Sequence, residues 1–335
     1  MTTEFADLES VVGLGASETW AAFGDLGDGL PFAAAEAGLV ERMVRAIGRY
    51  PEDVVIDVPP LRQPLTVRSL AICAALAGCE PDYLPVIAAA VSALTDPELN
   101  AYGFTTTTGS AAPLVLVNGP VVERVGFNSG ANCLGPGNRA NATVGRCVSL
   151  VLRLVGGARS GFADMATLGQ PAKYTCCFAE NEAGSPWEAF HVEHGLGADQ
   201  SAVTVTAMSG IVETFEASTG VLADMVDSIA IVLAGSAPMM ELTGPDSGLV
   251  GGGQPLVVIT PEWAVEFDRQ GCSKASLREA LFERAVRERR GDVDLRIALN
   301  ADDILIVVAG GVGVKQAVIP NWNGGSRAVT VPVAG

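Results

Sequence analysis

Apolar positions along the chain follow two patterns, one with the period of a helix and one of short uninterrupted runs. The helical spacing predicts helices over Phe32–Ile47, Thr66–Leu76, Asp82–Leu94, Asn138–Val155, Ser218–Val226 and from Ser273 or Ser276 to about Arg289. The apolar runs predict buried strands over Val54–Val58, Pro113–Val117, Tyr174–Ala179, Ala202–Ala207, Pro255–Ile259 and Ile304–Ala309. Helices that alternate with such strands predict an α/β protein whose sheets are covered on both faces.

The second half of the chain repeats the order of elements found in the first half. Pro113–Val117 and Pro255–Ile259 have similar sequences, and each is followed by a short helical segment, a capped longer helix and another strand. This order predicts an internal pseudo-repeat that forms two similar α/β lobes, residues 51–210 and 211–335, after an acidic segment and helix in residues 1–50. A chance likeness is the alternative, because buried strands share their composition.

In two such lobes, the loops at the carboxyl ends of the strands are the expected place for a ligand. In open α/β sheets, ligands bind beyond these ends. The loops concerned follow Val117, Ala179, Ile259 and Ala309. We therefore expect a ligand cleft between the lobes, lined by these loops.

Composition supports a large folded core and excludes some functions. Of 335 residues, 49% are apolar and 18% are charged, so the chain can bury a sizeable core. Lys and Arg number 21 against 38 Asp and Glu, a formal net charge of −17. Without a basic stripe, no nucleic-acid partner is expected.

The hydropathy of the chain and its N-terminal residues indicate where the protein is located and whether it forms oligomers. The sequence starts with an acidic segment that lacks the features of a secretory signal, and its longest apolar stretches are shorter than the roughly 18 residues of a spanning helix. We therefore expect a cytoplasmic protein with no membrane partner. The mean hydropathy of +0.34 favours a homo-oligomer, because excess apolar surface is commonly used in subunit contacts.

The segment Asn128–Arg146 combines glycines, a helix start and two arginines. Asn138 is placed to cap the helix, while Gly135 and Gly137 let the backbone approach a ligand. A helix N-terminus attracts anions, and Arg139 and Arg146 add positive charge on one helix face. The pattern predicts a carboxylate or phosphate site. The alternative is a glycine-rich turn whose arginines form salt bridges.

Thiols, carboxylates and the only two histidines follow one another closely after residue 174. On a strand, Cys177 and Ala179 would share one face, while Cys176, Phe178 and Glu180 would share the other. A cysteine near His191 and a carboxylate is typical of an activated thiolate nucleophile. Glu180 or Glu182 with His191 could equally act as base and acid without a nucleophile.

Further candidate residues complete the expected site. Cys133 is a second candidate thiol, Asn118 follows the first long apolar strand, and Lys315 lies in the glycine-rich loop after Ala309. Most of the seven cysteines are expected to be small buried side chains, because their spacings match no zinc or redox motif. His191 and His194 have no partner motif elsewhere, so no metal and no cofactor are expected.

Four sequence segments resemble those of a known family. They are Ala77–Val86, Pro113–Pro120, Leu134–Arg146 and Ala179–Glu188, within residues 66–206. They are similar to a poorly characterised bacterial family associated with the UGSC (seleno)proteins. Longer relatives carry a domain with the U/C-Gly-Ser-Cys motif, which this chain lacks, so a selenium or vicinal-thiol mechanism does not carry over. The resemblance favours an enzyme over a scaffold without naming its chemistry.

Together these patterns predict an enzyme that acts on a small anionic organic molecule in the cleft between the lobes. The reaction would be hydrolysis, C–N or C–S lysis, or isomerisation, through a thiol or through Glu and His. The alternative is a noncatalytic small-molecule-binding subunit that works with a thiol- or selenol-bearing partner.

Overall fold

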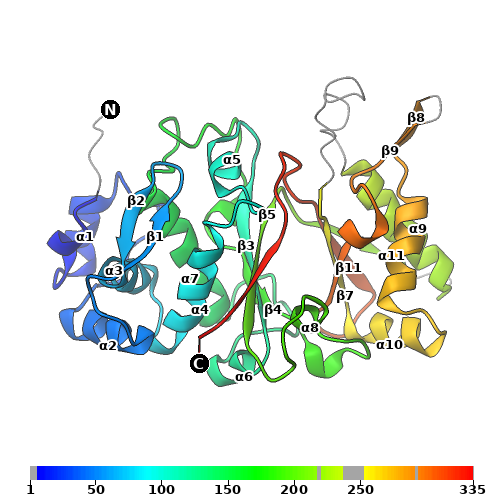
Figure 1. Ribbon diagram of the computed structural model, residues 1–335, viewed down its shortest axis with the longest axis horizontal. Helices are drawn as coiled ribbons and strands as arrows, with labels where there is room; N and C mark the ends of the chain where they lie inside the picture. The colour runs from blue at the N-terminus through cyan, green and yellow to red at the C-terminus, as the bar shows by residue number, and fades with distance from the viewer. Residues whose placement is uncertain (1–5, 217–219, 237–252, 291–292, 335) are drawn as a thin grey trace.

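The chain folds into four layers in the order helices, sheet, sheet, helices (Figure 1). The structure, a computed structural model, describes residues 6–216, 220–236, 253–290 and 293–334. Two four-stranded mixed sheets form the inner layers, and helices pack on their outer faces. The predicted α/β class is therefore confirmed.

Both four-stranded sheets have the same arrangement of strands. The first has the order β12-β5-β3-β4, with bounds β12 Val329–Pro332, β5 Ala202–Met208, β3 Ala112–Asn118 and β4 Cys177–Ala179. The second has the order β6-β11-β7-β10, with bounds β6 Val212–Phe215, β11 Lys315–Ile319, β7 Leu256–Ile259 and β10 Leu305–Val308. In each sheet one parallel pair, β3 with β4 or β7 with β10, is extended by two antiparallel strands.

The chain crosses between the sheets twice. β6 follows β5 directly in sequence but pairs in the second sheet, and β12 follows β11 but pairs in the first. The boundary expected at residue 210 lies at the first crossing. At the second crossing the last described strand, β12, pairs with β5 in the first sheet. β12, from beyond that boundary, therefore completes the first sheet, whereas β6 lies on the same side of the boundary as the other strands of the second sheet.

Helices of the first half cover the outer face of the first sheet. They are α1 Ala16–Phe23, α2 Ala37–Ile47, α3 Val67–Ala77, α4 Leu84–Ala93, α5 Ala101–Thr106, α6 Val121–Val125 and α7 Arg139–Leu150. A small hairpin of β1 Val54–Val58 and β2 Gln63–Thr66 precedes α3. The Thr66 hydroxyl accepts a hydrogen bond from the Ser69 amide, so this residue caps α3 as the sequence predicts.

The second half is organised in the same way. Its helices are α9 Leu222–Gly235, α10 Pro261–Arg269 and α11 Lys274–Arg284, and a second hairpin joins β8 Glu288–Arg290 to β9 Val293–Leu295. The short helix α8 Phe190–Glu193 precedes residue 210 and contacts β5. Ser273 caps α11 by accepting a hydrogen bond from the Ser276 amide. The helix predicted from Ser218 begins at Leu222 in the structure, and Ser218 itself lies outside the described residues.

Strand pleating divides the apolar residues among three cores. Val115 and Val117 of β3 point toward α3, α4 and α7, whereas Leu114 and Leu116 point toward the second sheet. A third core lies between the second sheet and helices α9, α10 and α11. Both faces of each sheet are covered, as predicted, but helices cover one face and the other sheet covers the second. The region between the sheets is a packed apolar core.

Two predicted elements are shorter in the structure. The strand expected over Tyr174–Ala179 is limited to Cys177–Ala179, because Pro171–Lys173 forms a 3₁₀ turn. The long helix expected over Asn138–Val155 changes after Leu150 into a π-helical turn, Val151–Val155. In the part of the chain that the structure describes, no helix combines the length and apolar character needed to cross a bilayer.

Candidate functional site

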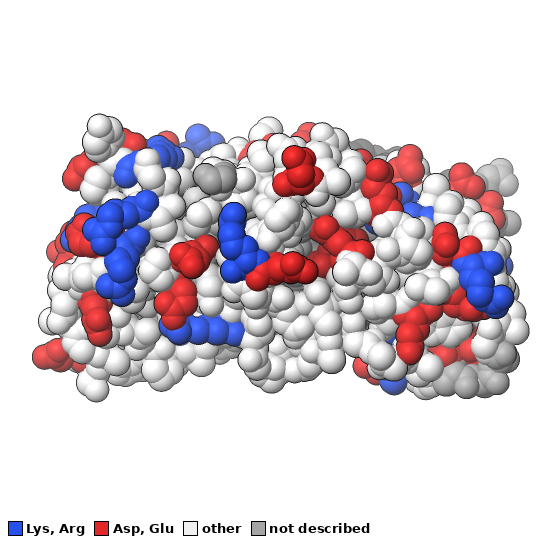
Figure 2. Space-filling model, turned by 90° about the horizontal axis from the view of Figure 1, so that it is seen from below, with Lys and Arg blue, Asp and Glu red and all other residues white. Residues whose placement is uncertain are grey.

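The carboxyl ends of β3, β4 and β10 lie close together at the lower face of the molecule, which Figure 2 shows from below with acidic side chains across its middle. The Asn181 amide donates a 2.7 Å hydrogen bond to the Val308 carbonyl, and the Gly310 amide donates one of 2.9 Å to Ser129. The loops after Ala179 and Ala309 therefore approach each other, as expected from the sequence. Five residues near this contact, which we call the strand-end cluster, are Asn118, Glu180, Glu182, His191 and Lys274.

Glu180 is the buried centre of the strand-end cluster. Its side chain follows Phe178 on the face of β4 that points toward the second sheet, as the predicted strand alternation requires. Oε2 accepts hydrogen bonds from Asn118 Nδ2 at 2.6 Å and from the Phe190 amide at 2.7 Å. Burial raises the pKa of Glu180, although Lys274 and these two donors act in the opposite direction.

Glu182 lies beside Glu180 and reaches the surface. Its Oε1 accepts hydrogen bonds from Asn118 Nδ2 at 2.9 Å and from the Gly119 amide at 2.7 Å. The side chain keeps 30% of its surface exposed. One Asn118 amide thus bridges two carboxylates, of which one is buried and the other is open to solvent.

His191 is fully buried against these carboxylates. Its Nδ1 lies 3.6 Å from Glu182 Oε1, which is within ion-pair range but too long for a hydrogen bond. Neither ring nitrogen has a hydrogen-bond partner among the described residues, and the same holds for Asn118 Oδ1. Buried polar atoms are rarely left unsatisfied, so these three atoms mark a place where partners are missing.

Lys274 is a site residue that the sequence analysis missed. It is the first residue of α11, and its ammonium donates to Glu193 at 2.9 Å and to the Glu188 carbonyl at 2.7 Å. The same ammonium lies 3.8 Å from Glu180 Oε1, and both side chains are almost completely buried. A lysine in an amphipathic helix is ordinarily a surface residue, so nothing in the helical pattern indicated a buried one. The only signal was its place directly after the capping residue Ser273.

The two candidate thiols do not have the surroundings of a nucleophile. Cys177 points into the core beneath the helices, and burial raises its pKa well above the ordinary value. Burial raises the pKa of Cys133 as well, although backbone N–H groups of Cys133, Leu134 and Gly310 act against it. Reactive cysteines are thiolates in accessible sites, so this geometry favours the carboxylate over the thiol.

The arginines of the glycine-rich loop have carboxylate partners. Asn138 caps α7 as predicted, and Arg139, the first residue of that helix, pairs with Glu80. Arg146 makes a paired contact with Asp28 at 2.7 and 3.0 Å. In the loop before the helix, Gly137 has a φ of 121°, and a Cβ at Gly135 would collide with Asn132. Among the described residues, no hydrogen bond or ion pair links these arginines to the strand-end cluster.

Lys315 lies at the start of β11, two strands away from β10. Its ammonium pairs with Glu213 at 2.8 Å and lies 4.0 Å from the centre of the Phe215 ring. The lysine is half exposed, so its charge is directed to the β6 edge of the sheet. Of the candidate residues, the fold brings Asn118, Glu180, Glu182 and His191 together and leaves Lys315 outside.

No protein-family model matches the chain, and no curated protein matches it. The described residues also contain no group of three or more His, Cys, Asp or Glu side chains arranged to hold a metal ion. The function is therefore argued from the geometry of the strand-end cluster.

Proposed function

We propose that the protein is an enzyme that moves a proton on a small polar substrate at the strand-end cluster, with Glu182 as the acid–base group. The observation that carries this proposal is the pair of carboxylates held by a single Asn118 amide, with unpartnered His191 nitrogens beside them. Carboxyl groups in contrasting environments are typical of acid–base sites.

Glu182 has the geometry that a proton-transfer group needs. Two donors fix its Oε1, which holds the carboxylate in one orientation. Among the described residues, no hydrogen bond engages its Oε2, and the side chain is accessible from the surface. Oε2 is therefore the atom that takes the proton from the substrate or returns it.

The neighbours of Glu182 position it and the substrate. Glu180 holds Asn118 by accepting one amide hydrogen, which leaves the other for Glu182. Asn118 Oδ1 is then the acceptor for a hydroxyl or amine of the substrate. His191, whose Nδ1 lies 3.6 Å from Glu182 Oε1, is a second polar group beside this carboxylate.

The charges of the site favour an uncharged or cationic substrate over the anion expected from the sequence. Lys274 lies beside Glu193 and Glu180, and the nearby Arg278 pairs with Glu193, so with Glu182 the site has three carboxyl groups for two cations. The chain as a whole carries a formal charge of −17. Isomerisation and lysis that begin with proton removal remain compatible with this site, whereas a thiol nucleophile is disfavoured by the buried cysteines.

The proposal includes an origin of the site by duplication. The two sets of strands match in order and direction, and each set ends with a strand that pairs in the other sheet. The first set is β3, β4, β5 and β6, and the second is β7, β10, β11 and β12. We take the two halves as a pseudo-repeat of two lobes with the substrate site at their common edge. The site then uses Asn118 and Glu180 from the first lobe and Lys274 from the second.

Glu182→Gln tests this function. The substitution keeps the size of the side chain and the Oε1 acceptor but removes the base. Wild-type protein is incubated in D₂O with a library of small amines and alcohols, and mass spectrometry identifies the compound that gains deuterium on carbon or changes mass. The variant should then convert that compound about 10²–10⁴-fold more slowly, the usual contribution of general acid–base catalysis.

Two control variants make the result specific. Glu123→Gln removes an exposed carboxylate just after β3 and should leave conversion unchanged. Cys177→Ala should retain most of the activity, because this thiol lies in the core. Equal conversion by wild type and Glu182→Gln would contradict the proposal, and loss of activity only in Cys177→Ala would return the thiol as the catalytic group.

A further inference from the structure

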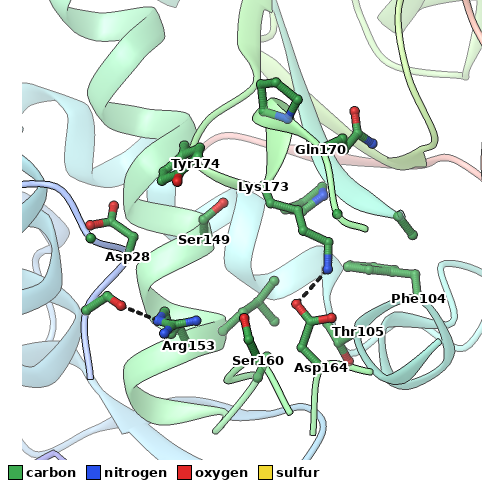
Figure 3. A pocket seen from close by; sticks show the side chains of 18 of the residues that line it. Asp28, Phe104, Thr105, Ser149, Arg153, Ser160, Asp164, Gln170, Lys173 and Tyr174 are labelled. Atoms are coloured by element: carbon green, nitrogen blue, oxygen red, sulfur yellow. Dashed lines mark hydrogen bonds and ion pairs between the residues drawn. The ribbon is translucent and has the colours of Figure 1, made fainter. Parts of the chain in front are cut away.

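A separate cavity lies at the opposite end of β3 from the strand-end cluster. It has a volume of about 730 Å³, and Ala111 and Pro113 at the start of β3 form part of its wall. The remaining wall comes from the segment before α2, from α5, from α7 with its π-helical turn, and from residues 158–174 (Figure 3). Cavities that bind small organic molecules have volumes of about 300–1,000 Å³.

Arg153 contributes the distinctive charge of this cavity. It lies on the π-helical turn, and such turns occur frequently at functional sites. Its Nε donates to the carbonyls of Leu26 and Gly27, which fixes the side chain against the wall. No hydrogen bond or ion pair engages its two terminal amino groups among the residues that the structure describes. Burial lowers the pKa of Arg153, with Asp28 and Asp164 acting in the opposite direction.

The other buried charges around the cavity are already balanced. Asp28 makes its paired contact with Arg146, and Lys173 pairs with Asp164 at 2.6 Å on the opposite wall (Figure 3). Asp25 at the rim is exposed, so water screens its charge. The positive charge of Arg153 is therefore left for a ligand.

The polar and apolar side chains of the cavity wall indicate which chemical groups a ligand would need besides its charge. Ser149 lies one helical turn before Arg153, and its buried hydroxyl has no hydrogen-bond partner among the described residues. Across the cavity, the almost completely buried Phe104 forms part of the wall, and Leu168 at the rim is 92% exposed. A ligand with one anionic end and an apolar body would match these surfaces.

We propose that this cavity binds a small organic carboxylate, whose carboxylate pairs with the terminal amino groups of Arg153 and whose apolar body lies against Phe104 and Leu168. The planar guanidinium group matches a carboxylate with two parallel hydrogen bonds. The site is distinct from the strand-end cluster and does not depend on the function proposed there.

Calorimetric titration of the full chain with benzoate, and with benzamide as its uncharged counterpart, tests the proposal. Benzoate should bind at least about tenfold more tightly, because a charge-assisted pair is stronger than a neutral hydrogen bond. Arg153→Gln should lower the benzoate affinity by about tenfold or more and leave that for benzamide unchanged. Arg139→Gln, which removes an arginine outside the cavity, should bind benzoate as wild type does.

Hydrogen exchange of wild-type protein localises the ligand without any substitution. Benzoate should protect amides of residues 25–29 and 151–155, which border the cavity. If Arg153→Gln fails to fold, this map and a reduced benzoate affinity of Ser149→Ala decide the question. Equal binding of benzoate and benzamide, unchanged affinity in a folded Arg153→Gln, protection confined to other segments, or no binding of benzoate would overturn the proposal.

Discussion

At the scale of single residues, Glu180 shows how burial and hydrogen bonding compete. Three groups favour its ionised form, namely Lys274 at 3.8 Å, the Phe190 amide and the Asn118 amide. The loss of water around a side chain with no exposed surface outweighs them, so the pKa rises above the ordinary value. The protein therefore contains a carboxyl group that binds its proton more tightly folded than unfolded.

This difference predicts a pH dependence of stability. A raised pKa in the folded state contributes stability that is fully present below the ordinary value of 4.5 and is lost as the pH rises through the folded pKa. Glu180→Gln cannot lose a proton, so between pH 4 and 7 wild type should lose stability relative to this variant. Urea unfolding at a series of pH values measures the difference.

Glu123→Gln provides the matched control for that series. Its carboxylate is exposed, so the free energy of unfolding should differ from wild type by an amount that hardly changes with pH. A difference between wild type and Glu180→Gln that stayed constant would show that Lys274 and the amide donors offset burial, and a difference that moved in the other direction would show that they outweigh it.

At the scale of elements, α7 is held tightly against β4 through a glycine. A Cβ at Gly145 would lie 2.5 Å from Thr175 Oγ1 and 2.8 Å from the Cys176 amide nitrogen. Contacts this short require the helix to move away from the strand, because backbone atoms cannot rotate aside. The close approach positions the start of α7, where Asn141 bonds to Asn128 and to Cys133 in the glycine-rich loop.

Gly145→Ala should therefore destabilise the protein by about 1–3 kcal/mol, the usual cost of overpacking a core. Gly38→Ala is the matched control, because the nearest atom to its new Cβ is the end of the Arg42 side chain at 3.8 Å. On the exposed face of α2 this change should stabilise by about 0.5–1 kcal/mol through helix propensity. Equal effects of the two substitutions in urea unfolding would contradict the tight packing of α7.

At the scale of the whole molecule, the exchange of β6 and β12 ties the two sheets together. The first sheet includes β12 from the end of the chain, the second begins with β6 directly after β5, and the core between the sheets contains residues from both. Unfolding one half would expose the edge of β5 or β11 and one side of this shared core. The two halves should therefore unfold together.

Differential scanning calorimetry should show a single transition, with the van't Hoff enthalpy close to the calorimetric enthalpy. Val329→Asp places a charge at a buried position of β12 and should lower the midpoint of this one transition without splitting it. Val312→Asp, at a position that is 90% exposed, should leave the midpoint nearly unchanged. Two separate transitions in wild type would show that the halves are independent.

The sequence by itself determined the elements whose causes are local. Apolar periodicity located β3, β5, β7 and β10, and polar caps located the starts of α3, α7 and α11, because these signals depend on neighbours within a few residues. Strand alternation also assigned Cys177 and Glu180 to opposite faces of β4. The order of residues along the chain thus placed Asn118, Glu180, Glu182 and His191 among the candidates, together with others, such as Arg146 and Lys315, that the fold places elsewhere.

Only the tertiary structure decided which side chains these candidate residues contact. Burial of Cys177 beneath helices, the pairing of Arg146 with Asp28, and the approach of Lys274 to Glu180 each join segments distant in sequence. Local patterns contain no information on such contacts. The same holds for the face-to-face packing of the two sheets, because an apolar strand buried by helices and one buried by another sheet have the same composition.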